Sequence, residues 1–481
     1  MFLLKKFGFL KWFYYTDGIQ IIKILNLNYF YISYLTLQAN AYLKCIMPHC
    51  GLEYSIKSGV FECEKGHLLD AKYKKIPSRA LKELFYSRRN PQGSIFNESG
   101  VWRFRELLNF CQIDTGNVEE CAKHLVSLDG AEGRQSKPYH MSKVANFVGL
   151  KNENLSLQPE GYNPSGSFKD NGMSAAVTHA KLVGAKKIVC ASTGNTSASA
   201  GMYAANENIE CDVYIPSGQI APGKLSQAYQ FGAQLILVEG NFDEAFAKSL
   251  EAAKKFGGYT VNSINPFRIE GQKTIPYRAL ENLNWEAPDW IVYPGGALGN
   301  TSSCGKSLME LYEWKWIKKI PRIAVVNAEG ANTLYDLYNG KFEETELRWN
   351  AGKPNTELIK KYYSYLDEKK IRPKTKATAI QIGRPSNILK AIRALEFTNG
   401  VVTQVSDEEM LDGMSIVGLN GFDCEMASGS VPAGIKKLTK EEIIKKDDVV
   451  IGILTGRQKD AMLSVDYHNN PNNLFAIPPK K

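Results

Sequence analysis

A single lysine stands where a turn-forming run meets a helix-forming one in NPSGSFKDNGMSAA, residues 163–176. Asn, Pro, Ser and Gly lead into this Lys169, and residues typical of helices follow it. A solvated surface lysine is one interpretation, although the positive end of the helix dipole disfavours a cation at a helix start. The other is catalytic, because a lysine amine is the side chain that condenses with an aldehyde cofactor.

Three other segments place small and hydroxylated residues directly after apolar, strand-like runs: CASTGNTSASAG (190–201), YPGGALGNTSS (293–303) and ILTGRQKD (453–460). Glycine-rich turns and helix starts offer backbone N–H groups to an anion. One such turn alone is weak evidence. Three of them with Lys169 match the needs of pyridoxal phosphate, which are an amine, a phosphate cradle, a ring partner and a hydrogen bond to the phenolic oxygen.

The elements that must position these groups alternate regularly from about residue 185. Amphipathic helices are predicted at 242–257 and 387–400, each ending in glycine, and Ser406 with Glu409 forms a capping box. Between the helices lie short β-branched runs that predict buried strands: KKIVCAS, CDVYIP, QLILVEG, YTVNS, DWIVYPGG, RIAVVNAEG, TAIQIG, VVTQV and VVIGILTG. The pattern predicts an α/β protein with two doubly wound, mostly parallel sheets that bind ligands at the carboxyl ends of their strands.

Composition is that of an ordinary globular protein, with 481 residues, 44% apolar and 23% charged. The net charge of +9 is too dilute for a nucleic-acid surface, since the first 46 residues alone hold five lysines against one aspartate. The nine cysteines show no framework spacing. We therefore expect reduced thiols, a cytoplasmic protein and no nucleic-acid partner.

Residues 1–46 differ in composition from the rest, with many aromatic residues and neither Glu nor Arg. The apolar run 19–37 is long enough to span a bilayer, but Lys23, Asn26 and Asn28 interrupt it, which argues against a membrane segment. We interpret residues 1–46 as a dispensable extension, with the working protein beginning near Met47.

Cys45, at the end of this extension, and Cys50, Cys63 and His67 just beyond it have the side chains of a zinc ribbon. Their spacing, Cx4C and Cx3H in place of paired CxxC, argues against one. We interpret residues 47–75 as a degenerate ribbon-like segment and expect no metal site.

Several motifs together resemble threonine synthase, of the tryptophan-synthase-β superfamily of pyridoxal-phosphate enzymes. The resemblance covers about residue 45 to the C-terminus. It runs through GVWRFRELL (100–108), NPSGSFKDNG (163–172), CASTGNTSAS (190–199), PGKLSQA (222–228), VNSINPFRIEGQKT (261–274), GGALGN (295–300), DCEMASGSVPAGI (423–435), and LTG with KD (454–460). It implies the type II fold of pyridoxal-phosphate enzymes, with a larger cofactor-binding domain in 76–170 and 270–481, a smaller α/β domain in 171–269, and a possible homodimer.

Carried over residue by residue, the resemblance implies that Lys169 forms the internal aldimine, a Schiff base, and then shuttles protons. Asn195 would bond the phenolic oxygen, and Thr455 would face the pyridine nitrogen. The backbone of Gly295, Gly296, Ala297, Leu298 and Gly299 would hold the cofactor's phosphate. The substrate would contact Ser192, Thr193, Thr196, Asn262, Ser263, Arg268 and Asn300.

The implied activity is that of a lyase in threonine biosynthesis, which converts O-phospho-L-homoserine and water to L-threonine and phosphate by γ-elimination and β-replacement. A serine or threonine dehydratase, or a cysteine-synthase-like enzyme, would share Lys169 and Asn195 but has no need of Arg268. An inert paralogue that binds phosphorylated metabolites is the alternative from a different class.

Overall fold

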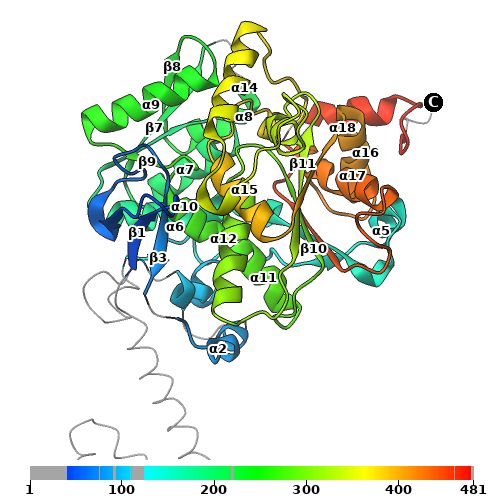
Figure 1. Cartoon of the computed structure of the whole chain (residues 1–481), viewed down its shortest axis with the longest axis horizontal. Coiled ribbons are helices and arrows are strands. Elements are labelled where there is room, and N and C mark those ends of the chain that lie inside the picture. The colour runs from blue at the N-terminus through cyan, green and yellow to red at the C-terminus, as the bar shows by residue number, and fades with distance from the viewer. Residues whose placement is uncertain are drawn as a thin grey trace, which may run out of the picture.

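The computed structural model describes residues 41–477 except 75, 90–93, 109, 111–123, 218–221 and 460. Three sheets organise the described chain (Figure 1). The predicted extension lies outside the described residues except for its last six, 41–46.

The first sheet is antiparallel with the order β2-β1-β3. Its strands are β1 (Ala41–Cys45), β2 (Glu53–Ser55) and β3 (Leu69–Tyr73). β1 is the central strand, and its Leu43 and Cys45 are buried. The predicted boundary after residue 46 would separate this strand from the two that pair with it.

The second sheet has six strands in the order β12-β11-β10-β13-β5-β4, all parallel except the edge strand β4. Its strands are β4 (Tyr139–His140), β5 (Leu155–Pro159), β10 (Trp290–Pro294), β11 (Arg322–Ala328), β12 (Val401–Val405) and β13 (Val450–Leu454). Both faces are covered by helices, as the continuous apolar strands predict.

Strand β10 shows how the two faces are divided. Ile291 and Tyr293 join the apolar cluster beneath α12 (Gly299–Glu313) and α15 (Ile388–Phe397). Trp290 and Val292 point the other way, into the cluster with α5 (Ser142–Val148), α16 (Asp407–Gly418) and α17 (Met426–Lys440). This alternation follows from the period of two along a strand.

The third sheet is fully parallel, with the order β8-β7-β6-β9. Its strands are β6 (Lys187–Ala191), β7 (Glu210–Pro216), β8 (Gln234–Val238) and β9 (Tyr259–Thr260). The helices α6 (Lys169–Leu182), α7 (Asn195–Asn206), α8 (Pro222–Gln230), α9 (Phe242–Phe256), α10 (Pro266–Gln272) and α11 (Thr274–Asn282) accompany it. These strands fall inside 171–269, and those of the six-stranded sheet fall outside it; the domain boundaries themselves stay a prediction.

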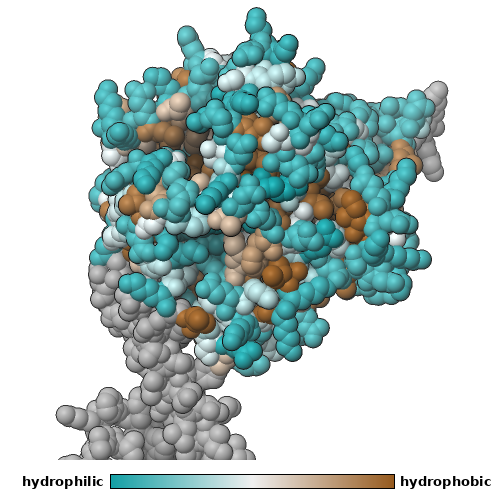
Figure 2. Space-filling view, viewed as in Figure 1, coloured by the Kyte–Doolittle hydropathy of each residue, from teal (hydrophilic) through white to brown (hydrophobic). Residues whose placement is uncertain are grey.

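The remaining helices connect these layers. They are α2 (Leu81–Ser87), α3 (Ile95–Glu98), α13 (Thr333–Tyr338), α14 (Thr356–Glu368) and α18 (Ala461–Asn469), with short 3-10 helices η2 (Ile56–Ser58), η3 (Trp102–Leu107), η4 (Asn152–Asn154), η5 (Glu160–Tyr162), η6 (Asn350–Gly352) and η7 (Thr378–Ile380). No helix in the described part of the chain is both long and apolar enough to cross a membrane. On the face shown in Figure 2, hydrophilic residues predominate and hydrophobic ones form separate small patches.

Most predicted elements are confirmed, and two details are wrong. The capping box of α16 forms between Ser406 and Glu409, and α9 ends at Gly257 with φ of 70°. The helix predicted at 387–400 ends at Phe397. The residue with positive φ after it is Asn399, not the predicted glycine. In the run TAIQIG, Thr378–Ile380 forms the 3-10 helix η7 instead of a strand, and its buried Ile380 lies against Gly296.

Candidate active site

Lys169 is the first residue of α6, and the turn before it is fastened to the end of β13. The N–H of Phe168 donates to the carbonyl of Thr455 at 2.9 Å, and the N–H of Arg457 donates to the carbonyl of Gly166 at 2.9 Å. The turn follows β5, which is the neighbour of β13 in the sheet. The predicted catalytic lysine and the predicted ring partner therefore lie at the carboxyl ends of adjacent parallel strands, as ligand sites of such sheets do.

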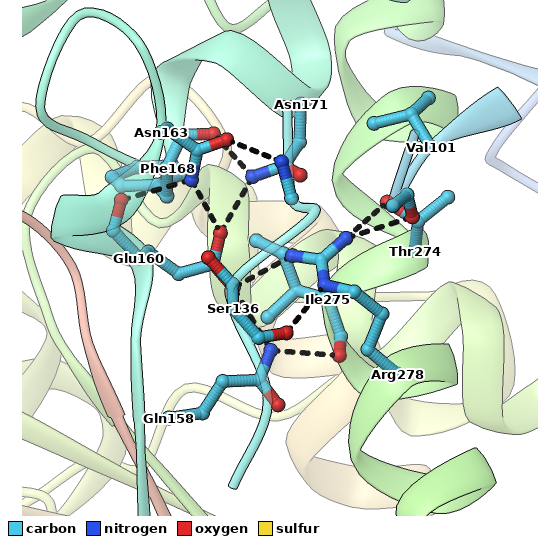
Figure 3. A network of polar contacts seen from close by, with 12 residues as sticks. Val101, Ser136, Gln158, Glu160, Asn163, Phe168, Asn171, Thr274, Ile275 and Arg278 are labelled. Carbon is cyan, nitrogen blue, oxygen red and sulfur yellow. Dashed lines mark hydrogen bonds and ion pairs between the residues drawn. The ribbon is translucent and has the colours of Figure 1, made fainter. Parts of the chain in front are cut away.

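A buried polar network supports this turn from beneath (Figure 3). The carboxylate of Glu160, with no exposed surface, accepts from Arg278 at 2.6 Å and from the side-chain amides of Asn163 at 2.9 Å and Asn171 at 2.7 Å. Gln158 donates to the same carboxylate at 2.8 Å. Because Asn163 and Asn171 flank Lys169 in sequence, the network fixes the backbone from which the lysine projects.

The amine of Lys169 has an electrostatic environment suited to chemistry near neutral pH. Burial lowers its pKa to about 7, and the positive charge of Arg268 acts in the same direction, while Glu425 opposes them. The amine lies over the Phe168 ring, 4.2 Å from its centroid. A neutral amine is the form that attacks an aldehyde or accepts a proton, so the site favours the reactive form.

Asn195 and Thr455, the predicted partners of the cofactor ring, share one carboxylate. The amide of Asn195 donates to Glu425 at 2.9 Å, and the hydroxyl of Thr455 donates to its other oxygen at 2.9 Å. Ser428 lies 3.1 Å from the Thr455 hydroxyl. Glu425, the residue before α17, thus joins a group on the four-stranded sheet to one on the six-stranded sheet. Glu425 lies in the motif DCEMASG, which is part of the family resemblance, but the sequence alone predicted no role for it.

A second lysine, also missed from the sequence, contacts Asn195. The amine of Lys459 donates to the side-chain oxygen of Asn195 at 3.0 Å, to Gln227 at 2.8 Å and to the carbonyl of Ser165 at 2.9 Å. Burial lowers its pKa from the ordinary value. Lys459 thereby orients the Asn195 amide toward the site and links it to the turn before Lys169. The KD pair at 459–460 was the available signal.

The loop between β10 and α12 has the form of an anion cradle. Leu298 has φ of 64°, α12 begins at Gly299, and its first turn holds no acidic residue. The N–H of Gly295 was predicted to donate to the cofactor's phosphate. In the structure it donates to the carbonyl of Val326 in β11 at 2.8 Å, so it extends the pairing of the sheet. Among the described residues, the N–H groups from Gly296 to Thr301 have no protein acceptor.

Two buried side-chain atoms at the same helix start also lack a protein partner in the described chain. They are the amide oxygen of Asn300 and the hydroxyl of Thr301. A helix start with free N–H groups, no carboxylate and unsatisfied polar side chains matches a phosphate. The residues present therefore fit pyridoxal phosphate, with Gly296 through Gly299 against its phosphate and Lys169 against its aldehyde.

Arg268 lies inside the protein on α10, with 1% of its surface exposed. One Nη donates to the carbonyl of Val261 at 2.7 Å, but the Nε of Arg268 has no protein partner. Burial lowers its pKa to about 10, so the guanidinium stays charged at neutral pH. Gly172 makes room for it, since a Cβ there would lie 2.7 Å from the Arg268 Nε. A buried, charged and incompletely bonded guanidinium suits an anionic ligand.

The other predicted substrate residues divide into two groups. Asn262 binds the backbone of Ala191 through both ends of its amide, at 2.9 and 3.0 Å, so it holds the loop after β6 in place. Ser263 lies 2.9 Å from Ser386, a neighbour not predicted from the sequence. The second group is partly exposed: Ser192 and Thr193 lie between β6 and α7, and Thr196 lies in the first turn of α7.

Comparisons with known proteins agree with this fold and site. A family model described as "Pyridoxal-phosphate dependent enzyme" matches residues 138–456. The L-serine ammonia-lyase of Rhizomucor miehei superposes with a TM-score of 0.54 at 19% identity, covering 69% of this chain and 96% of that one. Maize serine racemase gives 0.52 at 17%, covering 69% and 91%. The fold is that of a type II pyridoxal-phosphate enzyme, and pyridoxal phosphate is the cofactor of this protein.

Two curated relatives narrow the class. The threonine synthase of Methanocaldococcus jannaschii is 36% identical over 416 residues, 86% of this chain and 91% of its own. That of Methanosarcina acetivorans is 33% identical over 437 residues, 89% and 95% respectively. This chain belongs to the threonine synthase family.

Proposed function

We propose that this protein makes L-threonine and phosphate from O-phospho-L-homoserine and water. The observation that carries the proposal is Arg268, a buried guanidinium with an unpartnered Nε, close enough to Lys169 for its charge to lower the pKa of that amine. A substrate with an amine at one end and a phosphate at the other would satisfy both groups. The described cysteines are free thiols, which supports a reducing, cytoplasmic setting. A homodimer stays a prediction.

Different side chains of the site would transfer protons and bind the substrate's phosphate. Pyridoxal phosphate, when bound, supplies an aldehyde that condenses with amines and a ring that withdraws electrons. Lys169 would accept a proton from the substrate's Cα, release it, and only then accept one from Cβ, which an amine with a pKa of about 7 can do. Arg268, with Asn300 at the start of α12, would hold the phosphate that leaves Cγ. A proton would then return to Cγ, the hydroxyl of water would add at Cβ, and a last proton would return to Cα, which completes L-threonine.

The residues between the two sheets would orient the substrate. Ser192, Thr193 and Thr196 would bind its carboxylate from the start of α7, where the helix dipole favours an anion. Asn262 would act through the backbone it holds, and Ser263 would contribute its hydroxyl beside Gly299, because a Cβ at Gly299 would lie 3.5 Å from that of Ser263.

Replacement of Arg268 tests the proposal. Loss of a buried charged contact costs about 2–5 kcal/mol of transition-state stabilisation. In Arg268→Ala we expect kcat/KM for O-phospho-L-homoserine to fall by about two orders of magnitude or more. Arg268→Lys should recover little, because a point charge does not reproduce the planar fork. Bound cofactor, measured by visible absorbance, should stay at the parent level, since we propose that the separate loop 296–299 holds its phosphate.

The matched control is Arg103→Lys, since Arg103 is also buried and pairs with Glu281 at 2.6 Å. It should lower stability without changing the preference for O-phospho-L-homoserine over L-threonine or O-acetyl-L-serine. Faster turnover of either of those two by the parent protein would favour the dehydratase or the cysteine-synthase-like alternative. Absence of turnover with all three would favour the inert paralogue.

A further inference from the structure

The N-terminal sheet brings four potential metal ligands together, although their sequence spacing argued against a metal. Cys45 ends β1, Cys50 lies in the turn toward β2, and Cys63 and His67 bracket the turn before β3. The three sulfurs and one imidazole nitrogen all lie within 4.8 Å of one another. The sheet occupies the blue end of the chain in Figure 1, beside α6 and α10.

The distances within the group match those of a tetrahedral zinc site. The sulfur of Cys45 lies 3.5 Å from Nδ1 of His67, and the sulfurs of Cys50 and Cys63 lie 3.9 Å apart. Zinc–sulfur bonds of about 2.3 Å and zinc–nitrogen bonds of about 2.0–2.1 Å at tetrahedral angles give edges of about 3.5 Å for S···N and about 3.8 Å for S···S. These two edges already have the lengths that a zinc ion needs, and the other ligand atoms, all within 4.8 Å of one another, would have to close in by at most about 1 Å.

The backbone holds the ligands on two tight turns. The N–H of Cys50 donates to the carbonyl of Met47 at 3.0 Å. In the second turn, the N–H of Gly66 donates to the carbonyl of Cys63 at 2.7 Å, and the N–H of Cys63 donates to that of His67 at 2.8 Å. Gly66 has φ of 73°, which favours glycine. The antiparallel pairing of β1 with β3 brings the two turns together, so the site forms with the sheet.

We propose that Cys45, Cys50, Cys63 and His67 bind one structural zinc ion. Three thiolates and an imidazole complete a tetrahedron, so no position remains for water or substrate, which is the mark of a structural site. Cys45 and Cys63 are buried, whereas Cys50 and His67 are partly exposed, which leaves a path for the ion. The inference does not depend on the proposed reaction.

The sheet that the zinc would hold is joined to both larger units. The hydroxyl of Tyr73 donates to Glu270 of α10, and Asp70 pairs with Lys390 of α15 at 3.0 Å. Next to β2, the carbonyl of Ile56 lies 2.7 Å from Nε2 of His179 in α6. Zinc at the far end of β1 and β3 would therefore stabilise a module that braces α6 and α10.

Elemental analysis and spectroscopy of the full-length holoenzyme, purified under reducing conditions without chelator, test the proposal. We expect about one zinc per chain, with three sulfur and one nitrogen neighbours by X-ray absorption at the zinc edge. Replacement by Co²⁺ should give the strong visible ligand-field bands of a tetrahedral thiolate site. This measurement on the unmodified protein does not depend on the folding of any variant.

Cys50→Ser and His67→Gln should each lower zinc affinity by at least about 10–100-fold, since even loss of a group that only orients a ligand has that effect. The matched control is Cys211→Ala, a buried cysteine at the start of β7, which should keep about one zinc per chain. The proposal is overturned if the reduced protein binds neither Zn²⁺ nor Co²⁺. Full zinc affinity in Cys50→Ser, fewer than three sulfur neighbours, or a Cys50–Cys63 disulfide in the freshly purified protein would also overturn it.

Discussion

Replacement of the buried Glu160 by glutamine should destabilise the protein more than the same Glu→Gln replacement at any exposed position. The carboxylate is fully buried, and each of its oxygens accepts two hydrogen bonds, from Arg278 and Gln158 on one and from Asn163 and Asn171 on the other. Glutamine presents an NH₂ group to one of these pairs of donors, so two contacts become donor against donor. It also leaves the Arg278 charge without its counter-ion.

The expected loss in free energy of unfolding is about 3–5 kcal/mol, the cost of breaking a buried ion pair by removing one partner. That is a large part of the roughly 5–15 kcal/mol by which proteins are stable. Urea unfolding followed by far-ultraviolet circular dichroism measures the loss. The matched control is Glu251→Gln, which removes an exposed carboxylate 3.1 Å from Lys248 and should change little.

A double-variant cycle isolates the pair. Glu160→Gln combined with Arg278→Met should lose less than the sum of the two single losses, by about 0.5–3 kcal/mol, because neither charge is then buried alone. A loss below about 1 kcal/mol in Glu160→Gln, or strict additivity in the cycle, would refute the view that this network supports the Lys169 turn.

Three other perturbations test the site and the N-terminal sheet. The rate at which apoenzyme takes up pyridoxal phosphate, followed by absorbance, should rise through a pH of about 7 and level off above it, because the Lys169 amine reacts when neutral; a midpoint near 10 would contradict the lowered pKa. Gly271→Ala should lower the unfolding midpoint and kcat/KM, because its Cβ would lie 2.0 Å from the Asn171 carbonyl oxygen; parent-like values would show that α6 and α10 have room. Deletion of residues 1–46 should yield unstable or insoluble protein because it removes β1, whereas deletion of 1–40 should preserve activity; equal behaviour of the two truncations would count against a structural role for β1.

The sequence predicted the parallel strands well because a strand that is buried on both faces has a continuous apolar sequence. Runs such as WIVYP and IAVV are continuous and mostly apolar, and each becomes part of a central strand. TAIQIG has the same composition but no neighbouring strand to pair with; Ile380 instead covers the loop at Gly296. Apolar composition shows that a segment is buried, but the partner decides whether it becomes a strand.

The site was predictable where one residue type is chemically required and less so where tertiary contacts decide. Lys169 and Arg268 are distinguished by their chemistry and their motifs. Glu425 and Lys459 act through Asn195, a contact between elements more than 200 residues apart in sequence, which no local pattern records. The spacing of Cys45, Cys50, Cys63 and His67 did not predict the proposed metal site. Only the pairing of β1 with β3 brings their two turns together.

The close crossing of α6 and α10 gives the proposed substrate site a fixed length. Lys169 begins one helix and Arg268 lies on the other. Gly271 lets the backbone of α10 approach that of α6 at Asn171, and Gly172 leaves room for the Arg268 side chain. Close packing of this kind leaves the two helices little room to shift against each other. The distance between the Lys169 amine and the Arg268 guanidinium would then select substrates by length. We expect a phosphorylated amino acid one methylene shorter than O-phospho-L-homoserine to contact one of these two groups but not both.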